Sequence, residues 1–350
     1  MITLLQNKNN FYNYQKPITF KVSDCYARST NSLDLGCRKL FNQTSDIFEK
    51  KDVKEKKLEL LDDSLSITDR YIKAGRLYGS DIDVEVNTEN GILDKITNDN
   101  SAKIFIMNHD NQAADPKLLL IFNMFLMEMY KLKRQGEKCP EARIILNENI
   151  LKSSTPDNKA VLEKLGAVGV DLSGTNKNSL KNARKMLKLM NEFANDKANI
   201  FIFPEGKMSV FKSKPMEEKF QNGIANMVLK ELDMKKEVQV IPLGFSYPKK
   251  SKTVGIYIGN PIKFKADNEG VVSTSGNILE SEFVNSDYKK YFENFKDKEF
   301  SPICDNGKRV LAKDAVPYIA GILCENLKIC KSESYSMVEK NKDDTNVTLV

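Results

Sequence analysis

The chain has little histidine: one residue, His109, among 350. A mechanism that needs an imidazole base near neutral pH therefore has one candidate, because histidine is the side chain that ordinarily titrates there. The six cysteines form no Cys-x-x-Cys pair, so with a single histidine they offer no ordinary zinc site. We expect them to be reduced thiols of a cytosolic protein.

Long apolar stretches are also absent. The most apolar stretch, residues 118–130, has about 13 residues, whereas a helix that crosses a bilayer needs roughly 20. The N-terminal segment is too short and polar for a signal peptide. We therefore expect a cytoplasmic protein whose membrane contact is peripheral, on the inner face.

Several signatures of other protein classes are missing. The chain has no G-x-S-x-G sequence of an α/β hydrolase and no glycine-rich phosphate loop of a kinase or dinucleotide-binding protein. No dense basic tract with interleaved aromatic residues indicates nucleic acid. The net charge of +6 favours anionic ligands such as phosphates, coenzyme A or an anionic membrane.

From about residue 80, apolar runs typical of buried strands alternate with helical patterns. This alternation predicts an α/β fold with a mostly parallel central sheet flanked by helices. The predicted strands are residues 103–107, 142–146, 167–170, 199–203, 238–243 and 253–258. The predicted helices are residues 117–132, 157–165, 179–193 and 217–232.

Different patterns flank this region. Apolar residues at helical spacing over residues 32–78, with a charged run at 49–57, predict a small N-terminal helical module over residues 1–79. The α/β domain is expected over 80–265. Helices that include residues 310–327 form a C-terminal extension over 266–330, and the polar tail, 331–350, is expected to be disordered.

His109 lies directly after a predicted strand, in Ile-Phe-Ile-Met-Asn-His, and Asp115-Pro116 follows as a helix start. Active sites of α/β sheets gather at the carboxyl ends of strands. A carboxylate beside an imidazole can fix its tautomer and stabilise the imidazolium. Alternatively, the histidine ends a strand and the aspartate caps a helix, without further function.

A second sequence of this kind, Phe-Pro-Glu-Gly-Lys-Met-Ser at 203–209, also follows a predicted strand. Its glycine allows a sharp turn or a close approach to a ligand. Lys207, Lys212 and Lys214 supply positive charge suited to phosphate. Without a partner motif, this is an ordinary turn with surface lysines.

Together, the two motifs resemble those of the glycerolphosphate and lysophospholipid acyltransferases. The family's first motif is Asn-His, four residues, then Asp, which Asn108, His109 and Asp115 resemble; its third, Phe-Pro-Glu-Gly, is similar to residues 203–206. Weaker similarities are Val-Ile-Pro-Leu-Gly at 240–244, residues 220–225 and residues 259–262. The resemblance covers roughly residues 80–265, and the N-terminal module is loosely similar to that of the plastid-type enzymes.

Two departures from the family's pattern stand out. Five residues separate His109 from Asp115; either the loop accommodates the extra residue, or Asp110 takes the place of Asp115. The family's second motif carries an arginine for the acceptor phosphate, but residues 166–173 contain none. Lys177, Lys181 or Arg184 are the candidates to replace it.

The resemblance implies direct transfer of a fatty acyl group from acyl-CoA or acyl carrier protein to a hydroxyl of glycerol 3-phosphate or lysophosphatidate, in phospholipid synthesis. It implies His109 as general base and Asp115 as the carboxylate that orients it, with no cofactor or metal. The residues that it implies for substrate binding are Asn108, Phe203, Pro204, Glu205, Gly206, Lys207 and Ser209. Residues 118–130 line an acyl channel or are an ordinary buried helix.

Two alternatives remain open. One is acyl transfer to a non-glycerol acceptor such as an amine or polyol. The other is a degenerate member that binds lipid or acyl-CoA without turnover. Turnover separates an enzyme from a binder, and dependence on the acceptor phosphate separates the acceptor classes.

Overall fold

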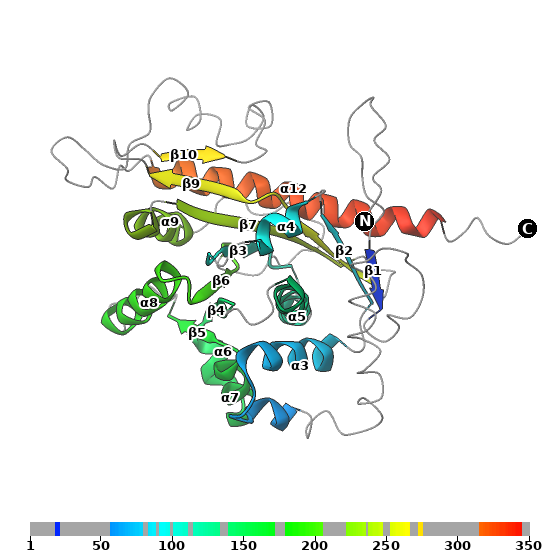
Figure 1. The fold of residues 1–350 in the computed structure, drawn as a ribbon, viewed down its shortest axis with the longest axis horizontal. Coiled ribbons are helices and arrows are strands. Elements are labelled where there is room, and N and C mark those ends of the chain that lie inside the picture. Colours follow the sequence, from blue (N-terminus) through cyan, green and yellow to red (C-terminus); the bar gives the residue numbers. More distant parts are fainter. Residues whose placement is uncertain are drawn as a thin grey trace, which may run out of the picture.

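The computed structural model describes residues 18–21, 57–79, 83–88, 91–98, 101–110, 115–133, 139–171, 179–205, 222–235, 237–247, 253–266, 272–275 and 315–344. These residues form an α/β fold in which helices flank a central, mostly parallel sheet (Figure 1). The fold class that the alternating pattern predicted is confirmed.

Within the described residues, the sheet has ten strands, in the order β1-β2-β8-β7-β3-β6-β4-β5, with β9 paired to β7 and β10 to β9. The run β7-β3-β6-β4-β5 is parallel throughout, so the carboxyl ends of these strands meet at one edge. The strands are β1 (Ile18–Lys21), β2 (Asp83–Thr88), β3 (Ile104–Met107), β4 (Glu141–Asn147), β5 (Ala167–Val170), β6 (Ala198–Ile202), β7 (Glu237–Ser246), β8 (Thr253–Ile258), β9 (Ile262–Ala266) and β10 (Val272–Ser275).

Both faces of the sheet are covered by apolar cores. Successive side chains of a strand point to opposite faces. In β3, Phe105 and Met107 therefore join one core, and Ile104 and Ile106 join the other. Burial on both faces explains why β3 is apolar at every position rather than alternating.

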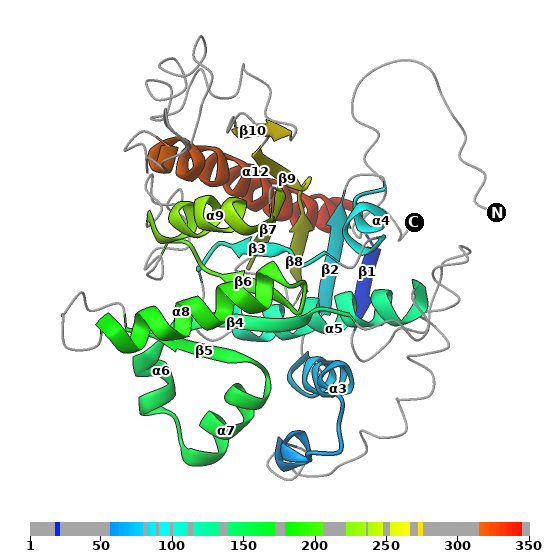
Figure 2. The same cartoon turned by 60° about the vertical axis from the view of Figure 1, so that its left-hand side comes forward.

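Helices divide between the two faces. Side chains of α3 (Ile67–Gly79), α4 (Ile92–Thr97) and α5 (Asp115–Lys133) pack in the first core. Side chains of α8 (Ser179–Ala194), α9 (Asn222–Lys235) and α12 (Ala315–Asp344) pack in the second. Figure 2 shows the course of these helices from another side. Three short helices complete the described structure: η2 (Glu59–Leu61), α6 (Glu148–Ser153) and α7 (Pro156–Lys164).

Helix α3 packs directly on α5, which lies between α3 and the sheet (Figures 1 and 2). A Cβ on Gly75 would lie 2.4 Å from the Cβ of Met124, so the two helices approach too closely for a larger residue. Arg76 and Glu128 form an ion pair of 2.8 Å across the same contact. Helix α3 shares the first core, and β1 pairs with β2 of the same sheet. Residues 1–17 and 22–56 lie outside the described structure, so the helical module expected over residues 1–79 stays a prediction.

The expectation of a disordered C-terminal tail is wrong for residues 331–344. Helix α12 continues to Asp344, and Ser334, Met337 and Val338 are buried. These few buried residues pack on the sheet. Because most of the residues between them are polar, the sequence shows no clear helical pattern of apolar residues there. Residues 345–350 lie outside the described structure.

The other predicted elements are found within a few residues of their expected bounds. The predicted helix at 217–232 is α9, which begins at Asn222; residues 217–221 lie outside the described structure. None of the helices in the described part of the chain combines the length and the hydrophobicity that a bilayer-spanning segment requires. Three cysteines there, Cys139, Cys324 and Cys330, are not joined in disulfide bonds.

Candidate active site

The two sequence motifs meet at the carboxyl edge of the sheet. Strands β3 and β6 are parallel neighbours, with Ile106 opposite Ile202, so the residues that follow them lie side by side. The imidazole of His109 packs against the ring of Phe203, with 4.7 Å between the ring centroids. The sheet therefore joins segments almost a hundred residues apart into one site.

His109 and Asp115 form a hydrogen-bonded pair. Nδ1 of the imidazole lies 2.6 Å from Oδ2 of Asp115, whose side chain is fully buried at the start of α5. A carboxylate only accepts hydrogen bonds, so Nδ1 carries the proton, and Nε2 of the neutral ring is left as the basic atom. Among the described residues Nε2 has no partner, and the side chain is 22% exposed. The pair thus forms despite the longer spacing between the two residues.

Tyr247, which directly follows β7, is a third member of this site that the sequence did not indicate. Its hydroxyl donates a hydrogen bond to Oδ1 of Asp115. Burial, and then the neighbouring Asp115 carboxylate, raise the pKa of Tyr247 well above its usual value, so the phenol stays protonated and a donor. The one feature of the sequence that could have indicated Tyr247 is its position directly after an apolar strand of the same sheet.

Asn108 fixes the backbone before the histidine. Its Oδ1 accepts from the backbone N–H of Phe245 at 2.6 Å, and its Nδ2 donates to the backbone oxygen of Phe245 at 3.0 Å. The side chain thereby continues the pairing of β3 with β7 by one step. Asn108 is fully buried, so its role in this structure is to hold the backbone beside the imidazole.

Asp110 does not take the place of Asp115. Its carboxylate accepts hydrogen bonds from Nζ of Lys331 and from Nδ2 of Asn108. Lys331 belongs to α12, and nothing in the sequence connects it with this site.

Glu205 faces the same loop from β6. Its Oε1 accepts the backbone N–H of His109 at 2.9 Å, whereas its buried Oε2 has no hydrogen-bond partner in the described structure. Burial raises the pKa of Glu205 to about 7, against the smaller opposing effect of the hydrogen bond from His109. Near neutral pH, the neutral and ionised forms are therefore both populated.

Several predicted binding residues lie outside the described structure: Gly206, Lys207, Ser209, Lys212, Lys214 and Lys177. Asn108, Phe203, Pro204 and Glu205 are described, and all four lie where β3 and β6 end. Helix α5, which covers the expected acyl-channel residues 118–130, is buried between α3 and the sheet as part of the first core.

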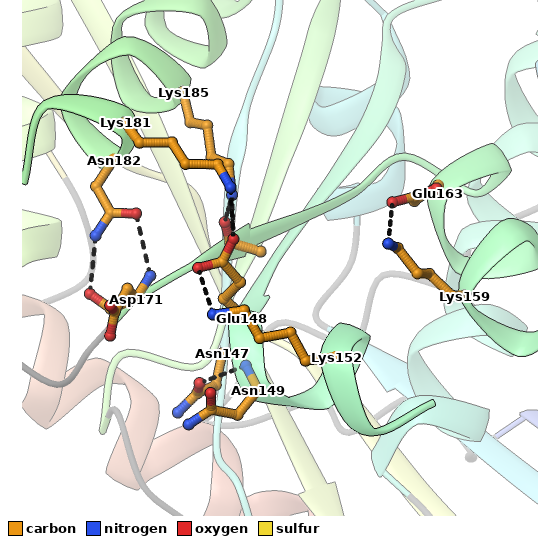
Figure 3. Close-up of polar contacts among 11 residues, drawn as sticks. Asn147, Glu148, Asn149, Lys152, Lys159, Glu163, Asp171, Lys181, Asn182 and Lys185 are labelled. Atoms are coloured by element: carbon orange, nitrogen blue, oxygen red, sulfur yellow. Dashed lines mark hydrogen bonds and ion pairs between the residues drawn. The ribbon is translucent and has the colours of Figure 1, made fainter. Parts of the chain in front are cut away.

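A group of lysines lies at the same edge, where β4 and β5 end (Figure 3). Lys152, Lys181 and Lys185 surround one carboxylate, Glu148, at 3.3, 3.4 and 3.0 Å. Lys185 also donates to the backbone oxygen of Gly169 at 2.7 Å. Hydrogen bonds from the lysines, that of Lys185 first, lower the pKa of Glu148 to about 2. The lysine cluster (Lys152, Lys181 and Lys185) therefore keeps an excess of positive charge.

The segment that resembles the family's second motif begins at Gly166 and forms β5. Gly166 has a φ of +75°, and a Cβ there would lie 2.1 Å from the backbone oxygen of Ala142. Of the residues considered in place of the missing arginine, Lys181 belongs to the lysine cluster, whereas Arg184 is exposed one turn of α8 further on.

Comparison of the chain with protein-family models and with curated proteins found no match.

Proposed function

We propose that this protein is an acyltransferase that moves a fatty acyl group from a thioester donor, acyl-CoA or acyl carrier protein, to the hydroxyl of a glycerophosphate-type acceptor. The observation that carries the proposal is the pair formed by His109 and Asp115. It lies at the carboxyl edge of a mostly parallel sheet, beside the Phe-Pro-Glu motif.

Nε2 of His109 takes the proton of the acceptor hydroxyl. The acceptor oxygen attacks the thioester carbonyl, so a C–O bond forms and the C–S bond breaks. The imidazolium returns its proton to the leaving thiolate. Asp115 stabilises the cation formed in between and is itself held by Tyr247. General base catalysis of this kind contributes roughly 10²–10⁴-fold to the rate.

Glu205 supplies a second polar group beside the base. Its Oε2 has no partner among the described residues, so a bound acceptor hydroxyl is the group that would satisfy it. In its neutral form, Glu205 donates a hydrogen bond there, and in its ionised form it accepts one.

The lysine cluster is the proposed contact for phosphate. Strand β4 is two strands from β3, and neighbouring strands are about 4.8 Å apart, so the cluster starts about 10 Å from the strand that carries His109. Three ammonium groups around one carboxylate leave a net charge of about +2, which suits a phosphate of the acceptor or of the acyl donor.

The test is acyl transfer from labelled palmitoyl-CoA to glycerol 3-phosphate, to lysophosphatidate, and to glycerol, which lacks the phosphate. We expect turnover with a phosphorylated acceptor and a loss of at least about a hundredfold in His109→Ala, with acyl-CoA binding retained. Turnover that is unchanged in His109→Ala would refute the role of His109. Binding without turnover would instead favour a non-catalytic lipid or acyl-CoA binder, and transfer to unphosphorylated acceptors would favour the other class of acceptor.

Lys181→Gln tests the phosphate contact. Its side chain is 64% exposed, so removing it should leave the fold intact while raising KM several-fold for whichever substrate brings the phosphate. Separate KM values for acyl-CoA and for glycerol 3-phosphate identify that substrate. The matched control is Lys159→Gln, a similarly exposed lysine of α7 that lies apart from the cluster in Figure 3. Equal KM values in the two variants would exclude the contact.

A further inference from the structure

The C-terminal helix reaches the candidate site through one side chain. Nζ of Lys331 lies 2.9 Å from Oδ1 and 2.8 Å from Oδ2 of Asp110. The Asp110 side chain is fully buried, and that of Lys331 is 12% exposed. With so little water near the pair, each charge depends on the other for stabilisation.

Through Asp110, this ion pair is connected to the backbone on both sides of His109. Asp110 accepts a hydrogen bond from Nδ2 of Asn108 at 3.1 Å, and Asn108 is bonded to both backbone groups of Phe245. The residue before the histidine is thus anchored to β7, and the residue after it is anchored to α12.

The part of helix α12 that carries Lys331 is itself fixed against β7. A Cβ on Gly244 would lie 1.9 Å from the backbone oxygen of Cys330, so helix and strand are in direct backbone contact. The hydroxyl of Ser246 donates to the backbone oxygen of Ser334 at 2.9 Å. Lys331 therefore extends from a fixed backbone.

Carboxyl groups gather around His109. Three carboxyl groups, Asp110, Asp115 and Glu205, surround the residue, and Lys331 is the cation that contacts one of them. The charged and titratable groups that face this site from the described elements are Asp110 of its own loop, Asp115 of α5, Glu205 after β6, Tyr247 after β7, and Lys331 and Tyr335 of α12.

We infer that Lys331 is a positioning residue of this site. It holds Asp110, and through it the backbone of His109, and its charge offsets the carboxylates around the imidazole. The helix that provides it lies outside the part of the chain that resembles the acyltransferases. The contact is independent of the proposed function, whereas its consequence for turnover rests on that function.

Removing the ammonium group should favour the protonated imidazole. An uncompensated Asp110 carboxylate, on the residue next to His109, stabilises the cation and disfavours the neutral base. The same field acts on Glu205, whose pKa is raised by Asp110 and lowered by Lys331. In Lys331→Met, more of the protein would then carry a protonated His109 at neutral pH.

The chain offers a direct measurement, because its single histidine gives one imidazole signal in a histidine-labelled NMR spectrum. We would follow the titration of that signal in the wild type, Lys331→Met, Asp110→Asn, and the double variant. We expect the midpoint to be higher in Lys331→Met than in the wild type, lower in Asp110→Asn, and close to the wild-type value in the double variant. Lys331→Arg, which keeps the charge, should titrate like the wild type.

Lys328→Met is the matched control, since Lys328 lies one turn earlier on α12 and pairs with Glu325. A midpoint in Lys331→Met equal to that in Lys328→Met would overturn the inference. If circular dichroism shows that Lys331→Met does not fold, the same titration is measured in Asp110→Asn. A His109 midpoint in Asp110→Asn equal to that of the wild type would then overturn the inference.

Turnover separates this inference from the proposed function. With an active enzyme, Lys331→Met should lose kcat/KM at pH 7 and recover it at higher pH, whereas Lys328→Met should do neither. A protein that is inactive towards every acceptor would refute the proposed function, and the titration would still decide the role of Lys331.

Discussion

Glu205→Gln should stabilise the folded protein at neutral pH. Burial raises the pKa of Glu205 from 4.5 to about 7, so the folded state resists ionisation that the unfolded chain undergoes freely. The stability associated with the neutral carboxyl is fully present below pH 4.5 and is lost as the pH rises to about 7. Glutamine stays neutral throughout, and its side-chain oxygen can still accept the backbone N–H of His109.

The size of this effect follows from the shift. A rise of the pKa from 4.5 to about 7 corresponds to about 3 kcal/mol, because each pH unit is worth about 1.4 kcal/mol. Between pH 5 and pH 8, the free energy of unfolding of Glu205→Gln should therefore gain about 2 to 3 kcal/mol relative to the wild type, with little further change above pH 8.

Urea unfolding at pH 5, 6, 7 and 8 measures this difference. Glu163→Gln is the control, because Glu163 is 53% exposed on α7 and pairs with Lys159 at 4.0 Å; its difference from the wild type should vary little with pH. If the difference in the free energy of unfolding between Glu205→Gln and the wild type is the same from pH 5 to pH 8, burial does not hold Glu205 neutral.

Two further predictions concern the pair of His109 and Asp115 and the packing of the sheet. Tyr247→Phe removes the hydrogen bond to Asp115, so turnover should fall by about tenfold with acyl-donor KM unchanged; wild-type kinetics would show that Asp115 needs no second partner. Gly166→Ala should cost several kcal/mol in urea unfolding, because its Cβ would meet the backbone of Ala142. Gly91→Ala, with a similar positive φ but nothing within 4 Å, should cost about 1 kcal/mol, so equal losses would exclude the steric explanation.

The sequence was most informative where one pattern determines the local structure. Runs such as Ile104–Met107 are buried on both faces of a parallel sheet and are therefore apolar throughout, which makes strand and layer predictable. Because parallel strands end at one edge, His109 and Glu205 could be placed together before the structure was known.

The residues that the sequence did not indicate depend on distant contacts. Tyr247 is 132 residues from Asp115, and Lys331 is 221 residues from Asp110, so no local pattern links them. The fold of α3 onto α5 depends on the absence of a side chain at Gly75, which composition does not reveal. The length of α12 was missed because few of its last residues are apolar.

The central claim is that His109 is the base, and the pH dependence of acyl transfer tests it most directly. The account predicts that the acidic limb of kcat/KM in the wild type coincides with the NMR titration of the single imidazole and that this activity is lost in His109→Ala. An activity that stays constant as the imidazole becomes protonated would contradict it.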